Sequence, residues 1–154
     1  MNLILWRHAE AGDAEPDLER RLTGRGRKQA ERMAQWLQSR LPERFVVLAS
    51  PAQRTRQTAD ALECEYRVDR RLAPDADVAH VLAAIEWPEG PEDSSGTVIV
   101  VGHQPTLGRL ASLLLAGQEM NWSVRKGAVW WLSTRERDER RQLVLKAVVS
   151  PDQL

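Results

Sequence analysis

Four side chains suited to binding an anion follow three short apolar runs in the sequence. Arg7 and His8 come directly after the first run, Arg54 follows the second, and His103 follows the third. The runs are residues 3–6, 45–49 and 98–101. Arginine offers a planar fork of N–H donors that fits two phosphate oxygens, and a neutral imidazole is a nucleophile toward phosphorus. These residue types indicate phosphoryl-transfer chemistry, provided that the fold gathers them.

Taken singly, each of these residues has an ordinary structural explanation. A lone histidine is often a hydrogen-bonded structural residue, and a lone arginine usually lies on the surface or in an ion pair. Gathered in one pocket, four cationic or ionisable groups repel one another unless an anion lies between them. Convergence is therefore what separates a phosphate site from four unrelated residues.

The three apolar runs predict buried strands of a parallel sheet, because they do not alternate apolar with polar residues. Apolar residues at three- and four-residue spacing predict helices between them. The predicted helices are Gly24 to about Leu41, 51–63 beginning at Pro51, a weaker one over 75–86, and 105–116 with Pro105 as its first residue. Residues 87–96 are rich in turn formers and predict an exposed loop. Residues 128–133 and 143–149 predict a hairpin joined by the charged run 134–141.

This alternation of strand and helix predicts an α/β fold, with a mainly parallel sheet that ends in an antiparallel element. Ligands of such sheets bind outside the carboxyl ends of the strands. Two arginines and two histidines then meet at one sheet edge. The helix that follows His103 is expected to direct its free N–H groups and positive dipole end into the same pocket.

Composition narrows the possible partners and compartment. The 154 residues predict one domain, 1–154, and the 22 basic residues balance the 22 acidic ones. A net charge of zero gives no overall attraction to nucleic acid or to a membrane, so we expect neither as a partner. The single cysteine, Cys64, excludes an internal disulfide framework. The first apolar run is too short to span a membrane and lacks signal-peptide features, so we expect a cytoplasmic protein.

Four motifs in this order resemble the histidine phosphatase superfamily, and more narrowly its small SixA-type phosphohistidine phosphatases. They are LWRHAEA at 5–11, LTGRG at 22–26, SPAQRTRQTA at 50–59 and VGHQP at 101–105. The resemblance runs from residue 1 to about 149. It implies a phosphoglycerate mutase-like fold, a three-layer α/β/α sandwich, that matches the fold predicted from the residues.

The resemblance also implies roles for the site residues. His8 matches the nucleophile, Arg7 and Arg54 match the phosphate clamps, and His103 matches the second histidine, which steadies the transferring group. We also expect Gln104 among the phosphate-binding residues. No cofactor is implied and no metal, since two histidines without a matching carboxylate pattern make a poor ligand set.

The proton donor is less well marked in the sequence. Larger members of the superfamily place a catalytic carboxylate in an insertion after the second helix or directly after the second histidine. Here the region after Leu62 is too short for that insertion, and Gln104 follows the histidine. Asp17 is our first candidate for an acid or water-orienting group, and Glu10 is the second. Alternatively, these acids only solvate the loop or pair with Arg20 and Arg21. A phosphohistidine needs little acid help, because its P–N bond is labile and its leaving imidazole is readily protonated.

A short chain without a capping domain predicts an open pocket. We expect the substrate to be a phosphohistidine-bearing protein, either a phosphotransfer domain or a phosphocarrier, and the enzyme to be a monomer. The alternatives are a phosphatase of a small phosphomonoester and a non-catalytic phosphate-binding module. Basic residues after the first loop either meet an acidic partner or form a solvated helix start. They are Arg20, Arg21, Arg25, Arg27 and Lys28. His80 matches no motif and is expected at the surface or in helix packing.

Overall fold

The computed structural model describes residues 1–154 and contains one six-stranded sheet. Its strand order is β3-β2-β4-β1-β5-β6. The strands are β1 Asn2–Arg7, β2 Val46–Ala49, β3 Arg67–Val68, β4 Thr97–Gly102, β5 Val129–Arg137 and β6 Arg140–Val149. β3, β2, β4 and β1 pair in parallel, whereas β5 pairs antiparallel with both β1 and β6. The predicted α/β class, with a mainly parallel sheet and an antiparallel hairpin, is confirmed.

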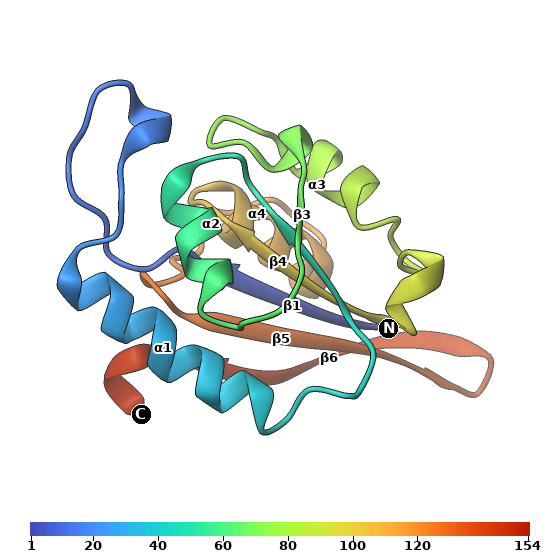
Figure 1. Ribbon diagram of the computed structural model, residues 1–154. Helices are drawn as coiled ribbons and strands as arrows, with labels where there is room; N and C mark the ends of the chain where they lie inside the picture. The colour runs from blue at the N-terminus through green and yellow to red at the C-terminus, as the bar shows by residue number, and fades with distance from the viewer.

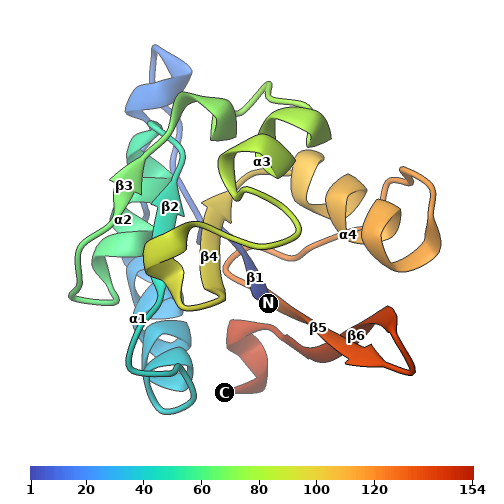
Figure 2. The same ribbon diagram turned by 90° about the vertical axis from the view of Figure 1, so that its right-hand side faces the viewer.

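Two helices cover each face of the sheet (Figures 1 and 2). The α-helices are α1 Gly24–Gln38, α2 Gln53–Asp60, α3 Val78–Ala84 and α4 Thr106–Ala116. Met33 and Leu37 of α1 pack with Ile4 and Trp6 on one face, and Leu107 of α4 packs on the other. Because β1, β2 and β4 are buried on both faces, their sequences are nearly continuous apolar runs. None of the helices has the length and hydropathy needed to cross a membrane.

Strand register brings three strand ends to one edge. Arg7 of β1 pairs with Gly102 of β4, and Ala49 of β2 pairs with Val101 of β4. Two further backbone bonds continue this alignment past the strands, from His8 N–H to Gly102 O and from Ser50 N–H to Val101 O, each 3.1 Å. The residues after each strand therefore start from the same level of the sheet.

Boundaries of all four helices differ from the sequence predictions, and α2 ends at Asp60 rather than at residue 63. α2 begins at Gln53 rather than Pro51, because Ala52 is extended and its N–H is held by the Ser50 hydroxyl. α4 begins at Thr106, with Pro105 as its cap rather than its first residue. α1 ends at Gln38, and residues 40 and 41 both donate to the carbonyl of Leu37 in a closing turn. The segment expected over 75–86 is the shorter helix α3, capped by Asp77.

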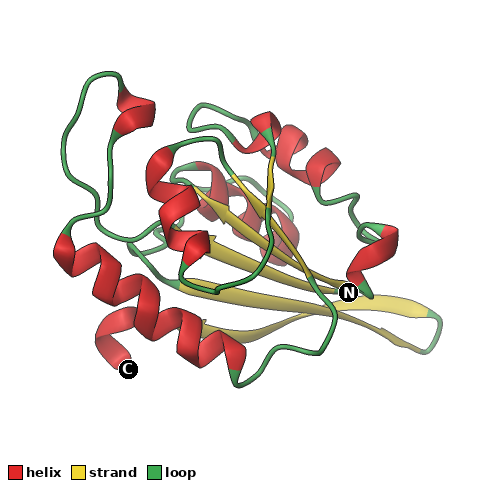
Figure 3. Cartoon of the chain, in the orientation of Figure 1, coloured by secondary structure: helices red, strands yellow, loops and turns green.

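The hairpin strands are longer than the sequence predicted (Figure 3). β5 and β6 continue through the charged run, and only Asp138 and Glu139 form the turn, both with positive φ. Positive φ at both positions is typical of a tight two-residue hairpin turn. Residues 87–96 are only partly an exposed loop, since Pro91 and Ser94 are buried around the short 3-10 helix Glu92–Ser94. Three other short 3-10 helices lie at Asp17–Glu19, Arg70–Leu72 and Pro151–Gln153.

Candidate active site

His8 lies directly after β1 with one ring nitrogen bonded and the other free. Its Nδ1 lies 2.7 Å from the carbonyl oxygen of its neighbour Ala9. A carbonyl only accepts, so Nδ1 carries the proton and the lone pair of the neutral ring is on Nε2. Nε2 has no hydrogen-bond partner and is not fully enclosed. The structure thus leaves the nucleophilic nitrogen of His8 open to a ligand.

His103 follows β4 and faces the same space. Its ring centroid lies 5.4 Å from that of His8, and the two ring planes are tilted by 56°. The two side chains are 7% and 4% exposed, so both are recessed below the surface. On its other side, His103 Nε2 lies 2.7 Å from the hydroxyl oxygen of Ser50, the residue that follows β2.

The two arginines are held by backbone carbonyls. Arg7 donates from Nη1 to the carbonyl of Val124 at 2.9 Å. Arg54 lies in the first turn of α2 and donates from Nη1 to the carbonyl of Asp17 at 3.0 Å. The hydroxyl of Thr58 fixes α2 against the strand end, because it donates to the carbonyl of Arg54 and accepts from the N–H of Ala9. Each guanidinium is therefore positioned while part of its donor set stays free.

Burial and charge keep both histidines neutral. Desolvation, with the positive charges of Arg54 and Arg7, lowers the pKa of His8 to about 4 despite the opposing bond to Ala9. Desolvation and the positive neighbours lower the pKa of His103 to about 3. Neutral rings remove most of the repulsion that four cations would suffer. At neutral pH the pocket contains two fixed positive charges, one nucleophilic nitrogen and one further imidazole.

Three buried side-chain nitrogens in the protein have no hydrogen-bond partner, and all three belong to this cluster. They are Nε of Arg7, Nε of Arg54 and Nδ1 of His103. Buried polar groups are almost always paired, and an unpaired one is costly. Three of them in one cluster are therefore a strong sign that an acceptor-rich ligand, such as a phosphoryl group, completes the site.

Comparison with known proteins agrees with this geometry. A model of the histidine phosphatase superfamily (branch 1) matches residues 3–76. The phosphohistidine phosphatase SixA of Escherichia coli is 31% identical over 125 residues, which cover 77% of this chain and 76% of that one. An uncharacterized protein of a Picosynechococcus strain is 34% identical over 77% of this chain and 75% of its own. The chain belongs to the histidine phosphatase superfamily.

Solved structures extend the match to the whole fold. A protein histidine phosphatase SixA complexed with tungstate superposes with a TM-score of 0.83 at 28% identity, over 99% of both chains. A mycobacterial glucosyl-3-phosphoglycerate phosphatase superposes at 0.68 with 20% identity, over 95% of this chain and 97% of that one, which shows the shared fold alone. The phosphoglycerate mutase-like architecture predicted from the sequence is confirmed.

Asp17, the first candidate acid, lies against Arg54. Its Oδ2 accepts from Arg54 Nη2 at 3.1 Å, and its Oδ1 lies 3.4 Å from Arg20 Nη1. Partial desolvation raises the pKa of Asp17, but the hydrogen bonds and charges of Arg54 and Arg20 outweigh it and hold the pKa below its usual value. Asp17 is therefore a carboxylate at neutral pH. A carboxylate can orient a water molecule or accept a proton from it, whereas it has no proton to donate.

Glu10 and Gln104 are engaged by the protein scaffold. The carboxylate of Glu10 accepts from the Thr23 hydroxyl at 2.9 Å, and no hydrogen bond joins it to the histidines or arginines of the site. Both polar atoms of the Gln104 side chain are occupied, since Nε2 donates to Trp122 O and Oε1 accepts from Gly108 N–H, each at 2.8 Å. These bonds cap the start of α4 and leave one hydrogen of the Gln104 amide nitrogen free, so its contact with phosphate stays a prediction.

Sequence reasoning missed Ser50 as a neighbour of His103 and the loop that holds the first strand end. Gly127 donates its N–H to the carbonyls of both Arg7 and His8, and the Val124 carbonyl of the same loop receives Arg7. Gly127 has a φ of +73° and lies against Pro151, where a Cβ atom would be 2.8 Å from the proline ring. A glycine two residues before an apolar strand was the available signal, although it named no partner.

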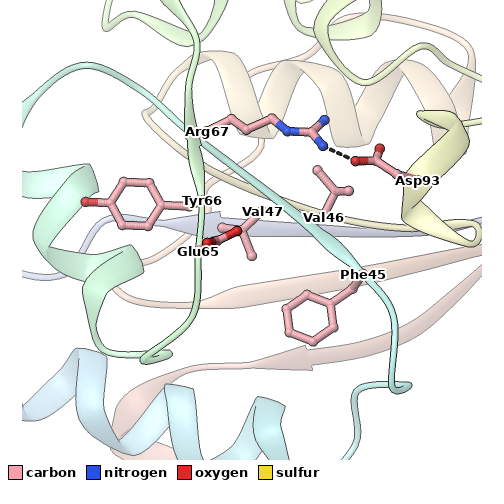
Figure 4. Close-up of a pocket in the computed structure, with 7 residues that line it drawn as sticks. All are labelled: Phe45, Val46, Val47, Glu65, Tyr66, Arg67 and Asp93. Atoms are coloured by element: carbon pink, nitrogen blue, oxygen red, sulfur yellow. Dashed lines mark hydrogen bonds and ion pairs between the residues drawn. The ribbon is translucent and has the colours of Figure 1, made fainter.

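Other features of the surface lie apart from this cluster. A hollow of about 490 Å³ opens beside β2 and β3, and none of the four site residues lines it (Figure 4). Its lining is Phe45, Val46, Val47, Glu65, Tyr66, Arg67 and Asp93. His80 is exposed and pairs with Asp77 at the start of α3, as a surface residue would. No three His, Cys, Asp or Glu side chains are grouped closely enough to hold a metal ion.

Proposed function

We propose that this protein is a metal-independent phosphatase that acts through a covalent phosphohistidine on His8 and removes phosphate from phosphohistidine in other proteins. The observation that carries the proposal is the set of three unpartnered buried nitrogens in the cluster that holds the open Nε2 of His8. The two arginine Nε–H groups among them can donate to the oxygens of a phosphoryl group, and the nucleophile belongs to the same cluster. The SixA relatives support the same reading.

The reaction has two displacement steps. In the first, the lone pair on Nε2 of His8 forms a bond to phosphorus while the P–N bond of the substrate breaks, and the departing imidazole takes up a proton from solvent water. In the second, water attacks the phosphorus on His8, the Nε2–P bond breaks, and inorganic phosphate forms. Arg7, Arg54 and His103 bind the phosphoryl oxygens through both steps, and their fixed donors stabilise the charge in each transition state.

The ionised state of Asp17 favours a substrate with a good leaving group. An alkoxide leaving from a phosphomonoester needs a proton in the transition state, and the carboxylate beside Arg54 does not carry one at neutral pH. Imidazole leaves more readily, so positioning and charge stabilisation suffice. We assign Asp17 to the second step, where a carboxylate accepts a proton from the attacking water.

A basic surface next to the site favours an acidic protein partner. Arg25, Lys28 and Arg32 lie on one side of α1 and line a hollow of about 260 Å³ that Pro151 and Asp152 close. None of the three cations has a hydrogen bond or ion pair within the protein. Gly127, which holds the His8 carbonyl, contacts the same Pro151, so the hollow adjoins the backbone of the catalytic loop. A phosphotransfer domain or phosphocarrier with acidic residues around its phosphohistidine fits this surface.

The deciding experiment compares turnover of four phosphorylated substrates. Two are peptides with one phosphohistidine, flanked in one case by glutamates and in the other by lysines, and two are p-nitrophenyl phosphate and an alkyl phosphate. We expect release of phosphate from both peptides, with a lower KM for the acidic one, weak turnover of p-nitrophenyl phosphate and least of the alkyl phosphate. A chelator should leave all rates unchanged.

Each alternative predicts another result in the same assay. Efficient hydrolysis of the alkyl phosphate with inert phosphohistidine peptides assigns the site to a small phosphomonoester. Binding of tungstate without turnover of any substrate assigns it to a phosphate-binding module. Loss of activity with the chelator and its return with added metal would overturn the metal-independent mechanism.

A further inference from the structure

Ser50 is fully buried at the end of β2 and contacts the second histidine of the site. Its hydroxyl oxygen lies 2.7 Å from His103 Nε2 and also accepts the N–H of Ala52 at 3.2 Å. The carbonyl of Ser50 is held in turn by the hydroxyl of Thr55 at 2.9 Å. The hydroxyl is therefore fixed between the start of α2 and the imidazole.

The acceptors available to Ser50 decide which group donates in the Ser50–His103 hydrogen bond. A serine hydroxyl has one hydrogen to donate, and the only acceptor within reach of Ser50 Oγ is His103 Nε2. If Nε2 carried the ring proton instead, the hydroxyl hydrogen of a fully buried serine would have no acceptor, which is costly. Donation from Ser50 to Nε2 satisfies the hydroxyl and places the ring proton on Nδ1.

We propose that Ser50 is a positioning residue that fixes His103 as its Nδ1–H tautomer, so that a donor rather than a lone pair meets the phosphoryl group. Nδ1 of His103 is one of the three buried nitrogens that lack a partner. With a proton there, all three are N–H donors, and the pocket presents a uniform donor set to phosphate oxygens. With the other tautomer, a lone pair on Nδ1 would face those oxygens and repel them.

The neutral state of the ring makes the tautomer matter. Burial, with the nearby positive groups, lowers the pKa of His103 to about 3, so at neutral pH the ring has a single proton to place. A doubly protonated ring would donate from Nδ1 whatever Ser50 did. Ser50 thereby orients one of the groups that bind phosphate in the proposed function. The tautomer itself does not depend on that function; only the expected effect on kcat does.

The test is ¹⁵N NMR of the histidine ring nitrogens in the whole protein at pH 7, which reports the tautomer without reference to activity. For the wild type we expect His103 to be protonated on Nδ1 and unprotonated on Nε2, and added tungstate to shift its Nδ1 signal. In Ser50→Ala we expect a mixture of tautomers and about a 10- to 100-fold lower kcat, with a smaller change in KM. Ser50→Cys keeps the shape and a weak donor, and should lie between the two.

Thr55→Val is the matched control, because it removes a buried hydroxyl that holds the Ser50 carbonyl and does not touch His103. It should keep the Nδ1–H tautomer. An Nε2–H tautomer in the wild type overturns the inference, even if every variant fails to fold. An unchanged tautomer and kcat in Ser50→Ala overturns it as well. An Nδ1–H tautomer in a protein that hydrolyses no phosphorylated substrate supports the role of Ser50 and overturns the proposed phosphatase function.

Discussion

The two histidines of the site are the same side chain held in opposite ways. His8 is bonded through Nδ1 to a backbone carbonyl and leaves Nε2 free, whereas His103 is bonded through Nε2 to a serine hydroxyl and leaves Nδ1 free. A carbonyl accepts a proton, so the free nitrogen of His8 has a lone pair. A hydroxyl that donates leaves the free nitrogen of His103 with a proton.

In the proposed mechanism, this difference divides the chemistry between the two rings. Both are recessed, both have a lowered pKa, and their centroids lie only 5.4 Å apart. Desolvation affects them alike, so it cannot decide which ring attacks phosphorus and which donates to its oxygens. The bonding partner of the other nitrogen decides, and it belongs to the backbone in one case and to a side chain in the other.

Replacing each histidine by alanine separates the two roles with the largest effect. We expect His8→Ala to abolish turnover, because no other side chain offers an open ring nitrogen beside the donors. His103→Ala removes one donor, so we expect kcat to fall about 10²- to 10³-fold while some turnover persists. Quenched reactions analysed by mass spectrometry should find an acid-labile phosphate on His8 in the wild type and in His103→Ala.

Thermal unfolding of both variants is the control. Cooperative unfolding of each variant shows that the fold is kept. A phosphate on His103, in the wild type or in His8→Ala, would exchange the two roles. Turnover retained in His8→Ala would remove the covalent mechanism altogether.

Lowering the pH should destabilise the free protein through the same two rings. Their pKa values are about 4 and about 3 when folded, against about 6.5 in the unfolded chain. Above pH 6.5 neither state binds the proton, so stability is complete. As the pH falls below 6.5 the unfolded chain takes up protons and the folded one does not, so the free energy of unfolding falls by up to about 1.4 kcal/mol per pH unit for each ring until the folded pKa is reached.

Urea unfolding at pH 7, 6 and 5 measures this slope. His103→Ala should have a smaller slope than the wild type, because one of the two rings is gone. Saturating tungstate should reduce the fall in the free energy of unfolding of the wild type between pH 7 and 5, since an anion between the rings favours their protonated forms. Equal slopes in the two proteins would show that His103 titrates normally in the folded state.

The sequence allowed much of the site to be predicted, because its parts are attached to strong local signals. Arg7, Arg54 and His103 follow apolar runs that predict buried strands. The register of these strands then aligns their ends at one edge of the sheet. Ser50 also follows an apolar run, but an uncharged hydroxyl gave no sign of its bond to His103, and the partners of the Gly127 loop are far away in sequence. The role of Gln104 stays a prediction, since adjacency to His103 gave no information on the direction of its side chain, which turns to Trp122.

The smallest expected effect is that of replacing Asp17. This substitution distinguishes the two chemical steps from each other, whereas the histidine variants distinguish the two rings. The Asp17 carboxylate contacts Arg54 and repels an incoming anion, so Asp17→Asn should bind tungstate about tenfold more tightly as an inhibitor. If Asp17 serves the attacking water, kcat should fall by about tenfold and the phosphate on His8 should accumulate, because only the second step is slowed.

Asp13→Asn is the matched control, since Asp13 lies exposed in the same loop and makes no hydrogen bond or ion pair within the protein. It should leave both tungstate inhibition and kcat unchanged. Tighter tungstate binding in Asp17→Asn with an unchanged kcat would reduce Asp17 to an electrostatic partner of Arg54. A slower first step, seen as a smaller burst of phosphate on His8, would instead make Asp17 the proton donor, and would require a carboxyl beside two arginines to keep its proton at neutral pH.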